Sequence, residues 1–315
     1  MDEKVVAYID LLAFSNHVRK NTGDAMMVFS NYNTILNSKI RNSQIYPVDS
    51  YIDELKELAK KNSIDCFEYF LPFSDSIFIV SNDINNFVTQ ISSFIYNCFH
   101  LTSHFYINPK DLKDPTKGDM VSFSLSEDGQ INSTMIDTHY HPTIFRGGVV
   151  YGEVFPLDLW GIVDSKPQKL KSLAGKAVVR AVELESKIKG PRIVFEQNTY
   201  DQLNEVIKSR YIRKIKNTDF YEILWPAITY IPENSKSNPD FNGFHDMFVA
   251  AVNLWKAYNH TPYSEHYFCF VELIITSTIQ FFTTLGYEVK AVELVRKAMK
   301  DKGLEDKIDN FDCLN

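Results

Sequence analysis

The sequence predicts an α+β sandwich of the ferredoxin-like kind, with a βαββαβ core followed by an all-helical C-terminal extension. Three observations predict this class. The chain opens on a short, β-branched apolar run, a hairpin signal surrounds Ser74 to Ser76, and helical and strand-like segments alternate from Asn82 to Trp225. We expect one mixed sheet covered by helices on one face.

The first elements are justified by their periodicity. Lys4 to Ile9 is too short for a core helix and is rich in β-branched residues, so it predicts a buried strand that Asp10 ends. Apolar residues at loose helical spacing follow from Asn16 to Ile40, and Tyr51 to Lys61 has one apolar face. Cys66 to Ser81 predicts two strands around a tight polar turn.

The middle of the chain predicts an amphipathic helix, a polar insertion and then alternating elements. Asn82 to Tyr106 has apolar residues three and four apart. The stretch from about 108 to 140 is polar and contains Pro and Gly, which indicates a surface insertion. The remaining elements are, in order, a strand at Ile144–Phe155, a helix at Ala174–Lys189, a strand at Arg192–Phe195, a helix at Asn198–Ser209 and a hairpin at Tyr211–Trp225.

Two domains are predicted, 1–225 for the sheet-containing part and 226–315 for a linker plus a helical region. Pro226 ends the sheet-containing part, and Pro232 to Asn242 has the composition of a linker or long loop. Tyr267 to Tyr287 is the longest apolar stretch, but Glu272 and several Thr residues interrupt it. It predicts a buried helix and no membrane insertion.

Composition excludes several classes of protein. Of the 315 residues, 44% are hydrophobic and 14% aromatic, which indicates a folded globular chain. The net charge of −7 disfavours a nucleic-acid partner. The four Cys residues form no CxxC pair and the N-terminus is unlike a signal peptide, so a reducing cytoplasm is expected. His139 and His141 are interpreted as surface histidines, because no carboxylate is placed to join them in a metal site.

Asp10 and Asp75 are the candidate metal ligands. Taken singly, each is better explained as a turn or helix-capping residue. On a βαββ layout, however, the first strand pairs with the hairpin and brings both carboxylates to one sheet edge. Two carboxylates so placed can hold two divalent cations, the arrangement that in-line displacement at phosphorus requires.

The turn after Asp10 is a candidate phosphate site. Leu11 to Ser15 leads into a helix, so its backbone N–H groups can receive phosphate oxygens. Every strand-to-helix turn offers some free amides. The neighbouring candidate metal ligand makes this turn more informative.

Four blocks of sequence resemble, in order, the class III adenylate and guanylate cyclase catalytic domain. They are AYIDLLAFS (7–15), PFSDSIFIV (72–80), FRGGVVYGEVF (145–155) and LAGKAVVRAVELE (173–185). The resemblance covers roughly residues 4 to 225. It implies a nucleotidyl cyclase, a lyase that dimerises head to tail and shares each active site between two protomers.

The same resemblance implies roles for particular residues. Asp10 and Asp75 match the two aspartates that bind Mg²⁺ or Mn²⁺, two ions per site, with the Leu11 carbonyl as a further ligand. Leu12, Ala13, Phe14 and Ser15 match the turn that holds the triphosphate.

Departures from the family pattern concern the base and the transition state. The positions that read a purine are Leu71 and Ser172, and the Asn and Arg of the helix block are replaced by Val179 and Glu183. The cations that can substitute for the missing Asn and Arg are Arg146, Lys176 and Arg180. In the last hairpin, Lys214 or Lys216 matches a phosphate-binding lysine of the family. For each of these residues, a solvated surface charge is the competing interpretation.

The base that the enzyme selects is predicted from the polar partners that the sequence lacks. Without polar partners at Leu71, adenine loses its family contacts, whereas a smaller ring can rest on an apolar wall narrowed by Phe70 and Phe73 and be read by Ser172. A hydrophobic wall discriminates weakly, so some activity on ATP or GTP is compatible with this prediction.

The short core, the IDLLAFS block and the appended C-terminal region resemble the Pycsar antiphage pyrimidine cyclases. That branch makes cyclic CMP or cyclic UMP from CTP or UTP on infection, and a separate effector protein senses the product. Three alternatives stay open: a catalytically inactive cyclase fold that binds nucleotide or dimerises, a purine cyclase with a rebuilt base pocket, and a polymerase-like or diguanylate-type palm. The acidic charge and the FSDS turn count against the palm.

Overall fold

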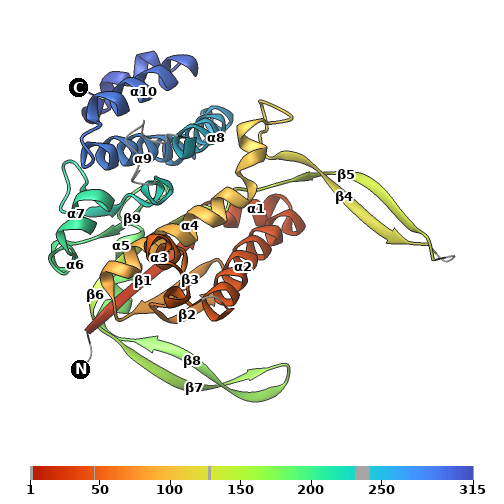
Figure 1. The fold of residues 1–315 in the computed structure, drawn as a ribbon. Helices are drawn as coiled ribbons and strands as arrows, with labels where there is room; N and C mark the ends of the chain where they lie inside the picture. Colours follow the sequence, from red (N-terminus) through yellow and green to blue (C-terminus); the bar gives the residue numbers. More distant parts are fainter. Residues whose placement is uncertain (1–2, 46, 127–128, 231–241, 315) are drawn as a thin grey trace.

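A seven-stranded mixed sheet forms the centre of the molecule and confirms the predicted α+β class (Figure 1). The computed structural model describes residues 3–45, 47–126, 129–230 and 242–314. The strand order is β10-β11-β9-β6-β1-β3-β2. The strands are β1 Glu3–Leu11, β2 Phe67–Phe73, β3 Ser76–Ser81, β6 Phe145–Glu153, β9 Ile193–Phe195, β10 Ile212–Lys214 and β11 Tyr221–Ile223.

Helices surround this sheet and form the C-terminal region. The α-helices are α1 Phe14–Lys20, α2 Thr22–Ile45, α3 Asp53–Asn62, α4 Ile84–Ile107, α5 Lys176–Glu185, α6 Gln197–Asp201, α7 Glu205–Tyr211, α8 Asn242–Tyr258, α9 Ser264–Thr283 and α10 Glu288–Asp301. Short 3₁₀ helices are η1 Val48–Ser50, η2 Trp225–Thr229, η3 Glu305–Asn310 and η4 Asp312–Leu314.

Strand β1 lies in the middle of the sheet, antiparallel to both β3 and β6. Val5, Ala7 and Ile9 belong to the large core on one face, whereas Val6 belongs to a smaller cluster on the other. The predicted continuous apolar run therefore reflects a strand that is buried on both faces.

The expectation that helices cover only one face is wrong. Helix α4 packs on the face of the large core, while α5 covers the other face through Ala177 and Ala181. Gly148 of β6 permits this packing, because a Cβ there would overlap the carbonyl oxygen of Ala181. Helix α5 therefore lies directly on β6.

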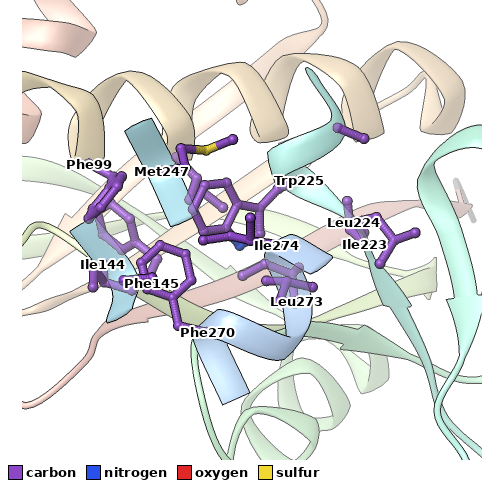
Figure 2. Packing of buried hydrophobic residues seen from close by; sticks show 14 of the residues in the cluster. Phe99, Ile144, Phe145, Ile223, Leu224, Trp225, Met247, Phe270, Leu273 and Ile274 are labelled. Atoms are coloured by element: carbon purple, nitrogen blue, oxygen red, sulfur yellow. The ribbon is translucent and has the colours of Figure 1, made fainter. Parts of the chain in front are cut away.

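The C-terminal helices share the large core with the sheet. Trp225 of η2 packs against both Phe99 of α4 and Phe270 of α9, with ring centroids 6.5 Å and 5.5 Å away (Figure 2). Its Nε1 donates a hydrogen bond to the carbonyl of Pro191 at 3.0 Å. Apolar contact with a satisfied indole N–H fixes α9 against the sheet domain.

An ionic cluster reinforces this contact at the β9–β11 side of the sheet. Glu222 of β11 is fully buried and accepts two hydrogen bonds from Arg192, at 2.9 Å and 3.0 Å. Arg192 and Arg213 both reach Glu272 of α9, at 2.6 Å and 3.0 Å. Because each buried charge has a partner, the cluster ties α9 to the sheet without an uncompensated ion.

Two long hairpins project from the body (Figure 1). The predicted polar insertion contains β4 Lys117–Leu125 paired with β5 Ile131–His139. A second hairpin pairs β7 Phe155–Val163 with β8 Lys166–Ala174. The sequence predicted neither hairpin, because both carry apolar side chains that no described core covers, such as Trp160 at 74% exposure.

Several predicted helices differ in extent. The segment from Asn16 to Ile40 divides into α1 and α2, because Asn21 is extended between them. The segment from Asn198 to Ser209 divides into α6 and α7. The predicted linker lies outside the described residues, except that Asn242 begins α8. No described helix is apolar over a length that would span a bilayer, and the predicted buried helix is α9.

Lys39 of α2 is buried, and it donates hydrogen bonds to two neutral oxygens. Its Nζ donates to the carbonyl of Asn62 and to Ser93 Oγ, each at 2.9 Å. Burial disfavours the ammonium and lowers the pKa of Lys39 from 10.5 to about 8. The unfolded chain therefore takes up this proton at a higher pH, so the free energy of unfolding falls as pH drops from about 10.5 to about 8.

We expect Lys39→Met to remove this pH dependence. The free energy of unfolding of the variant, relative to wild type, should rise by roughly 3 kcal/mol between pH 10.5 and pH 7.5, as follows from the shifted pKa. Urea denaturation at both pH values measures it, with Lys297→Met, an exposed lysine of α10, as the control. Parallel pH profiles for wild type and Lys39→Met would contradict the prediction.

Candidate active site

Asp10 stands near the end of β1, between Ser76 of β3 and Arg146 of β6 in the strand register. Its side chain shares the α5 face with Val6 and Tyr8, because successive residues of a strand alternate. Ser76 Oγ donates to Asp10 Oδ1 at 2.8 Å and lies 2.7 Å from the Tyr8 hydroxyl. These hydrogen bonds orient the carboxylate at the sheet edge.

Asp75 lies in the tight turn between β2 and β3, as the sequence predicted. Ser74 before it has φ 56°, a left-handed conformation that closes the turn. The backbone N–H of Leu11 donates to the carbonyl of Asp75 at 3.0 Å, which fixes the turn against the end of β1. The structure thus brings Asp10 and Asp75 to one edge.

The turn after β1 is held by its backbone. The N–H of Leu12 donates to the carbonyl of Ile144 at 2.8 Å, and Ala13 has φ 63°. Helix α1 starts at Phe14 and is seven residues long. The predicted phosphate turn therefore borders the same edge as the two aspartates.

Arg146 is shared between two carboxylates. Its Nη2 lies 3.5 Å from Asp10 Oδ2, and its Nε forms an ion pair with Glu185 Oε1 of α5. Burial raises the pKa of Asp10, and the charge of Asp75 raises it further. Burial also raises the pKa of Glu185. Sequence reasoning missed Glu185, because its position beside Arg146 depends on how α5 packs over Gly148.

A cavity of about 170 Å³ opens between the two aspartates, Arg146, the turn after β1 and the first turn of α9. The residues that line it are Asp10, Leu11, Leu12, Ala13, Phe14, Ser15, Asn16, Asp75, Arg146, Tyr263, His266 and Tyr267. The last three were missed, since no pattern in the sequence connects them to Asp10. This cavity is smaller than the pockets of roughly 300–1,000 Å³ that enclose whole small-molecule ligands.

The residues at this edge suit a magnesium-type ion. No group of three or more His, Cys, Asp or Glu that could hold a metal occurs in the described part of the chain. Two carboxylates completed by water and substrate phosphates are, however, the usual protein contribution to a Mg²⁺ site. Burial and the charge of Asp75 raise the pKa of Asp10 more than Ser76 and Arg146 lower it, and a divalent cation would favour the ionised carboxylate.

Lys176 and Arg180 line a different cleft, of about 1000 Å³, on the N-terminal side of α5. It extends along β1 from Val150, which pairs with Val6 about 13 Å from Asp10, to Glu3, about 23 Å from Asp10, at 3.3 Å per residue. Arg180 forms ion pairs with Glu183 and Glu196. Within one chain, Lys176 and Arg180 are not brought to the Asp10 edge.

Lys214 and Lys216 line a third cleft, of about 1050 Å³, beside the ionic cluster of Arg192 and Arg213. This is larger than the cavity at Asp10, but β10 is four strands from β1, or about 19 Å at 4.8 Å per strand. We place the chemistry at the smaller cavity, because that is where the two candidate metal ligands meet.

Two of the base-reading candidates, Leu71 and Phe73, lie on the α5 side of the sheet. Leu71 and Phe73 are on β2, two strands from β1, and Phe73 pairs with Ser76 in the register, as Asp10 does. Phe73 is 77% exposed. Phe70 instead points to the α4 face, where its ring contacts Phe94 at 5.4 Å, so its predicted role in narrowing a base pocket is wrong. Ser172 lies on β8, opposite Leu157.

The two histidines of the insertion have different surroundings. The Nε2 of His139 lies 3.5 Å from a carboxylate oxygen of Asp114, and both side chains are partly exposed. His141 is buried and stacks on His17 of α1, with ring centroids 3.9 Å apart. The prediction of a surface residue is therefore wrong for His141, because the hairpin returns against α1.

A scan against protein-family models finds no match for this sequence. A search of curated proteins finds none either. Solved structures with partial similarity are nucleotide cyclase domains. A dimeric guanylyl cyclase domain of the RhoGC fusion protein from the aquatic fungus Blastocladiella emersonii is 14% identical, with 71% of this chain and 97% of that chain covered and a TM-score of 0.36.

Two further structures show similar overlap. The guanylyl cyclase Cya2 is 11% identical, with 76% and 98% covered and a TM-score of 0.38. An adenylate cyclase from Trypanosoma brucei in its monomeric state is 11% identical, with 71% and 90% covered and a TM-score of 0.39. Superpositions of this quality assign no activity, so the chemistry has to follow from the side chains.

Proposed function

We propose that the chain is a nucleotidyl cyclase that converts CTP or UTP to the 3′,5′-cyclic monophosphate and pyrophosphate. One observation carries the proposal: Asp10 and Asp75 meet at one sheet edge, beside Arg146 and the turn after β1, around one cavity. The N–H groups of Leu11 and Leu12 already donate to the carbonyls of Asp75 and Ile144, so the N–H groups of residues 13–15 would receive phosphate oxygens. Carboxylates for cations, with a guanidinium and amides for phosphate oxygens, are what phosphoryl transfer needs.

In the reaction, the ribose 3′-oxygen forms a bond to the α-phosphorus while the bond from that phosphorus to the bridging oxygen breaks. Pyrophosphate leaves, and the hydroxyl proton ends on it or in solvent. Mg²⁺ or Mn²⁺ held by Asp10, Asp75 and the Leu11 carbonyl would lower the pKa of the attacking hydroxyl and offset phosphate charge. Arg146, already balanced between Asp10 and Glu185, can donate to phosphate oxygens without being drawn from the site.

The size of the cavity supports a shared active site. A space of about 170 Å³ suits phosphates and ions and leaves the nucleoside to another surface. The cleft of Lys176 and Arg180, which extends toward the Glu3 end of β1, presents cations outside the Asp10 cavity. A head-to-tail homodimer of the catalytic part, residues 1–225, would join that cleft of one chain to the Asp10 edge of the other, with residues 226–315 as a helical region.

The preference for a pyrimidine rests on the apolar surface of Leu71 and Phe73 on the α5 side of β2. Such a surface offers no partner for polar edge groups, each of which costs about 1–3 kcal/mol when left unpaired, and a pyrimidine has fewer of these groups than a purine. On the sequence resemblance alone, we further propose that the cyclic nucleotide is a messenger in antiphage defence, sensed by a separate effector.

Purified protein with Mn²⁺ and each of the four nucleoside triphosphates tests the activity and the base together. We expect mass spectrometry to identify cyclic CMP or cyclic UMP as the product. The kcat/KM for the better pyrimidine should exceed those for ATP and GTP by at least about tenfold, the factor that corresponds to the loss of one polar contact. A higher kcat/KM for ATP or GTP than for both pyrimidines would identify a purine cyclase.

A second candidate is a catalytically inactive module that binds nucleotide or dimerises. The ion pairs of Arg180 with Glu183 and Glu196 favour it, because they neutralise a cation that catalysis would use. Saturable Mn²⁺-dependent nucleotide binding by calorimetry, with no cyclic product from any of the four nucleotides, would establish this alternative.

A further inference from the structure

The first turn of α9 reaches the cavity that Asp10 and Asp75 share. Tyr263, His266 and Tyr267 line it, together with Arg146 and the turn after β1. Of the three, His266 carries a nitrogen donor suited to an anionic oxygen. The C-terminal region thus contributes a polar side chain to the proposed phosphate site.

The backbone of the α5–β9 connection fixes the imidazole of His266. The N–H of Gly190 donates to His266 Nδ1 at 3.0 Å, so Nδ1 is an acceptor and carries no proton. The proton of the neutral ring is then on Nε2. Because Nδ1 is taken by Gly190, Nε2 is the nitrogen available to a ligand in the cavity.

The loop and α9 are held in close contact on both sides of this hydrogen bond. Lys189 pairs with Glu265 at 2.6 Å, next to His266. Gly190 has φ 89°, and a Cβ there would lie 2.5 Å from the Cβ of Cys269. The ionic cluster through Glu272 anchors the following turn. His266 is therefore presented by a rigid support.

The charges around His266 favour the neutral ring. Burial lowers its pKa, and the nearby Arg146 guanidinium lowers it further. A protonated ring would also place a second N–H against the Gly190 donor. At neutral pH His266 offers one N–H donor beside the Arg146 cation.

Resting on the proposed cyclase activity, we infer that His266 Nε2 donates a hydrogen bond to a phosphate oxygen of the substrate, strengthening as charge moves onto the departing pyrophosphate. It would supply a donor that the helix block lacks, where Val179 is 61% exposed and Glu183 is an anion. The C-terminal helices would then be part of the active site.

Three variants test the inference. His266→Ala removes the donor, His266→Gln keeps an N–H at a similar distance from the backbone, and His260→Ala changes an exposed histidine in the loop before α9. We expect kcat to fall roughly 10- to 100-fold in His266→Ala, the range for a lost hydrogen bond to a charged group. The glutamine variant should recover at least a third of wild-type kcat, and His260→Ala should retain it.

Calorimetric titration with pyrophosphate and Mn²⁺ gives a readout that does not need turnover. Affinity should fall about tenfold or more in His266→Ala and stay unchanged in His260→Ala. If the wild-type protein converted no nucleotide, the proposed function would be wrong. This titration would still show whether His266 binds a phosphate oxygen. Wild-type kcat and pyrophosphate affinity in a folded His266→Ala protein would overturn the inference. Should that variant not fold, the glutamine variant decides, and a kcat below a tenth of wild type overturns it.

Discussion

Asp10→Asn is expected to reduce turnover by at least about 1,000-fold while the protein stays folded. Asp10 and Asp75 are the two carboxylates at the cavity, and on the proposed function each would supply an anionic ligand to ions that contribute several kcal/mol of transition-state stabilisation. About 4 kcal/mol corresponds to a factor of about 1,000 in rate. Asp75→Asn should have an effect of the same order. Product formation per chain, measured with CTP and UTP in Mn²⁺, gives the loss.

For Asp10→Asn, loss of activity through loss of metal can be distinguished from loss of activity through unfolding. Because burial raises the pKa of Asp10 in the folded chain, its ionisation lowers the free energy of unfolding as pH rises through the raised value. Asn at this position carries no such cost and can still accept the hydrogen bond from Ser76. Without metal, the variant should therefore melt within a few degrees of wild type at pH 7.

Mn²⁺ supplies the second readout. Saturating Mn²⁺ should raise the melting temperature of wild type, since an ion that binds only the folded chain stabilises it, and should leave that of Asp10→Asn almost unchanged. Asp49→Asn, an exposed carboxylate on η1, is the matched control and should behave as wild type. Near wild-type turnover in a folded Asp10→Asn or Asp75→Asn protein would end the metal assignment.

The parts of the fold that the sequence predicted are those that local periodicity determines. The run Lys4 to Ile9, the hairpin around Asp75 and the spacing in α4 each encode burial within one element. The sequences of the two projecting hairpins do not encode burial in this way, because their alternating apolar residues pack against no described core. A residue such as Trp160 looks like a core residue in sequence and is exposed in the structure.

The residues of the candidate site also fall into two groups, those that the sequence could predict and those that it could not. Asp10 and Asp75 could be predicted together because an antiparallel pair of neighbouring strands places their ends at one edge. Glu185 and His266 could not, since the first requires α5 to pack on Gly148 and the second requires α9 to fold back onto Gly190. Both depend on contacts between residues far apart in the sequence. Such contacts leave no periodic pattern to find.

Mixing two inactive variants is expected to restore activity if the site is shared between chains. Asp10 and Arg180 line different clefts, and Arg180 pairs with Glu183 and Glu196 of its own chain instead of lining the Asp10 cavity. In a symmetric head-to-tail dimer, a chain with Asp10→Asn and a chain with Arg180→Ala form one intact site and one doubly altered site. Random assortment then gives about a quarter of wild-type activity, because half of the dimers are mixed.

The control follows from the position of Arg146. The structure places Arg146 3.5 Å from Asp10 in the same chain. Asp10→Asn mixed with Arg146→Ala should therefore stay inactive, since each site in the mixed dimer has one lesion. Equal recovery of activity from both mixtures would contradict the shared site. A wild-type protein that is fully active and sediments as a monomer at the assay concentration would contradict it as well. Recovery with Arg180→Ala alone would show that the cation pairing with Glu183 and Glu196 in one chain is released to act on the substrate of the other.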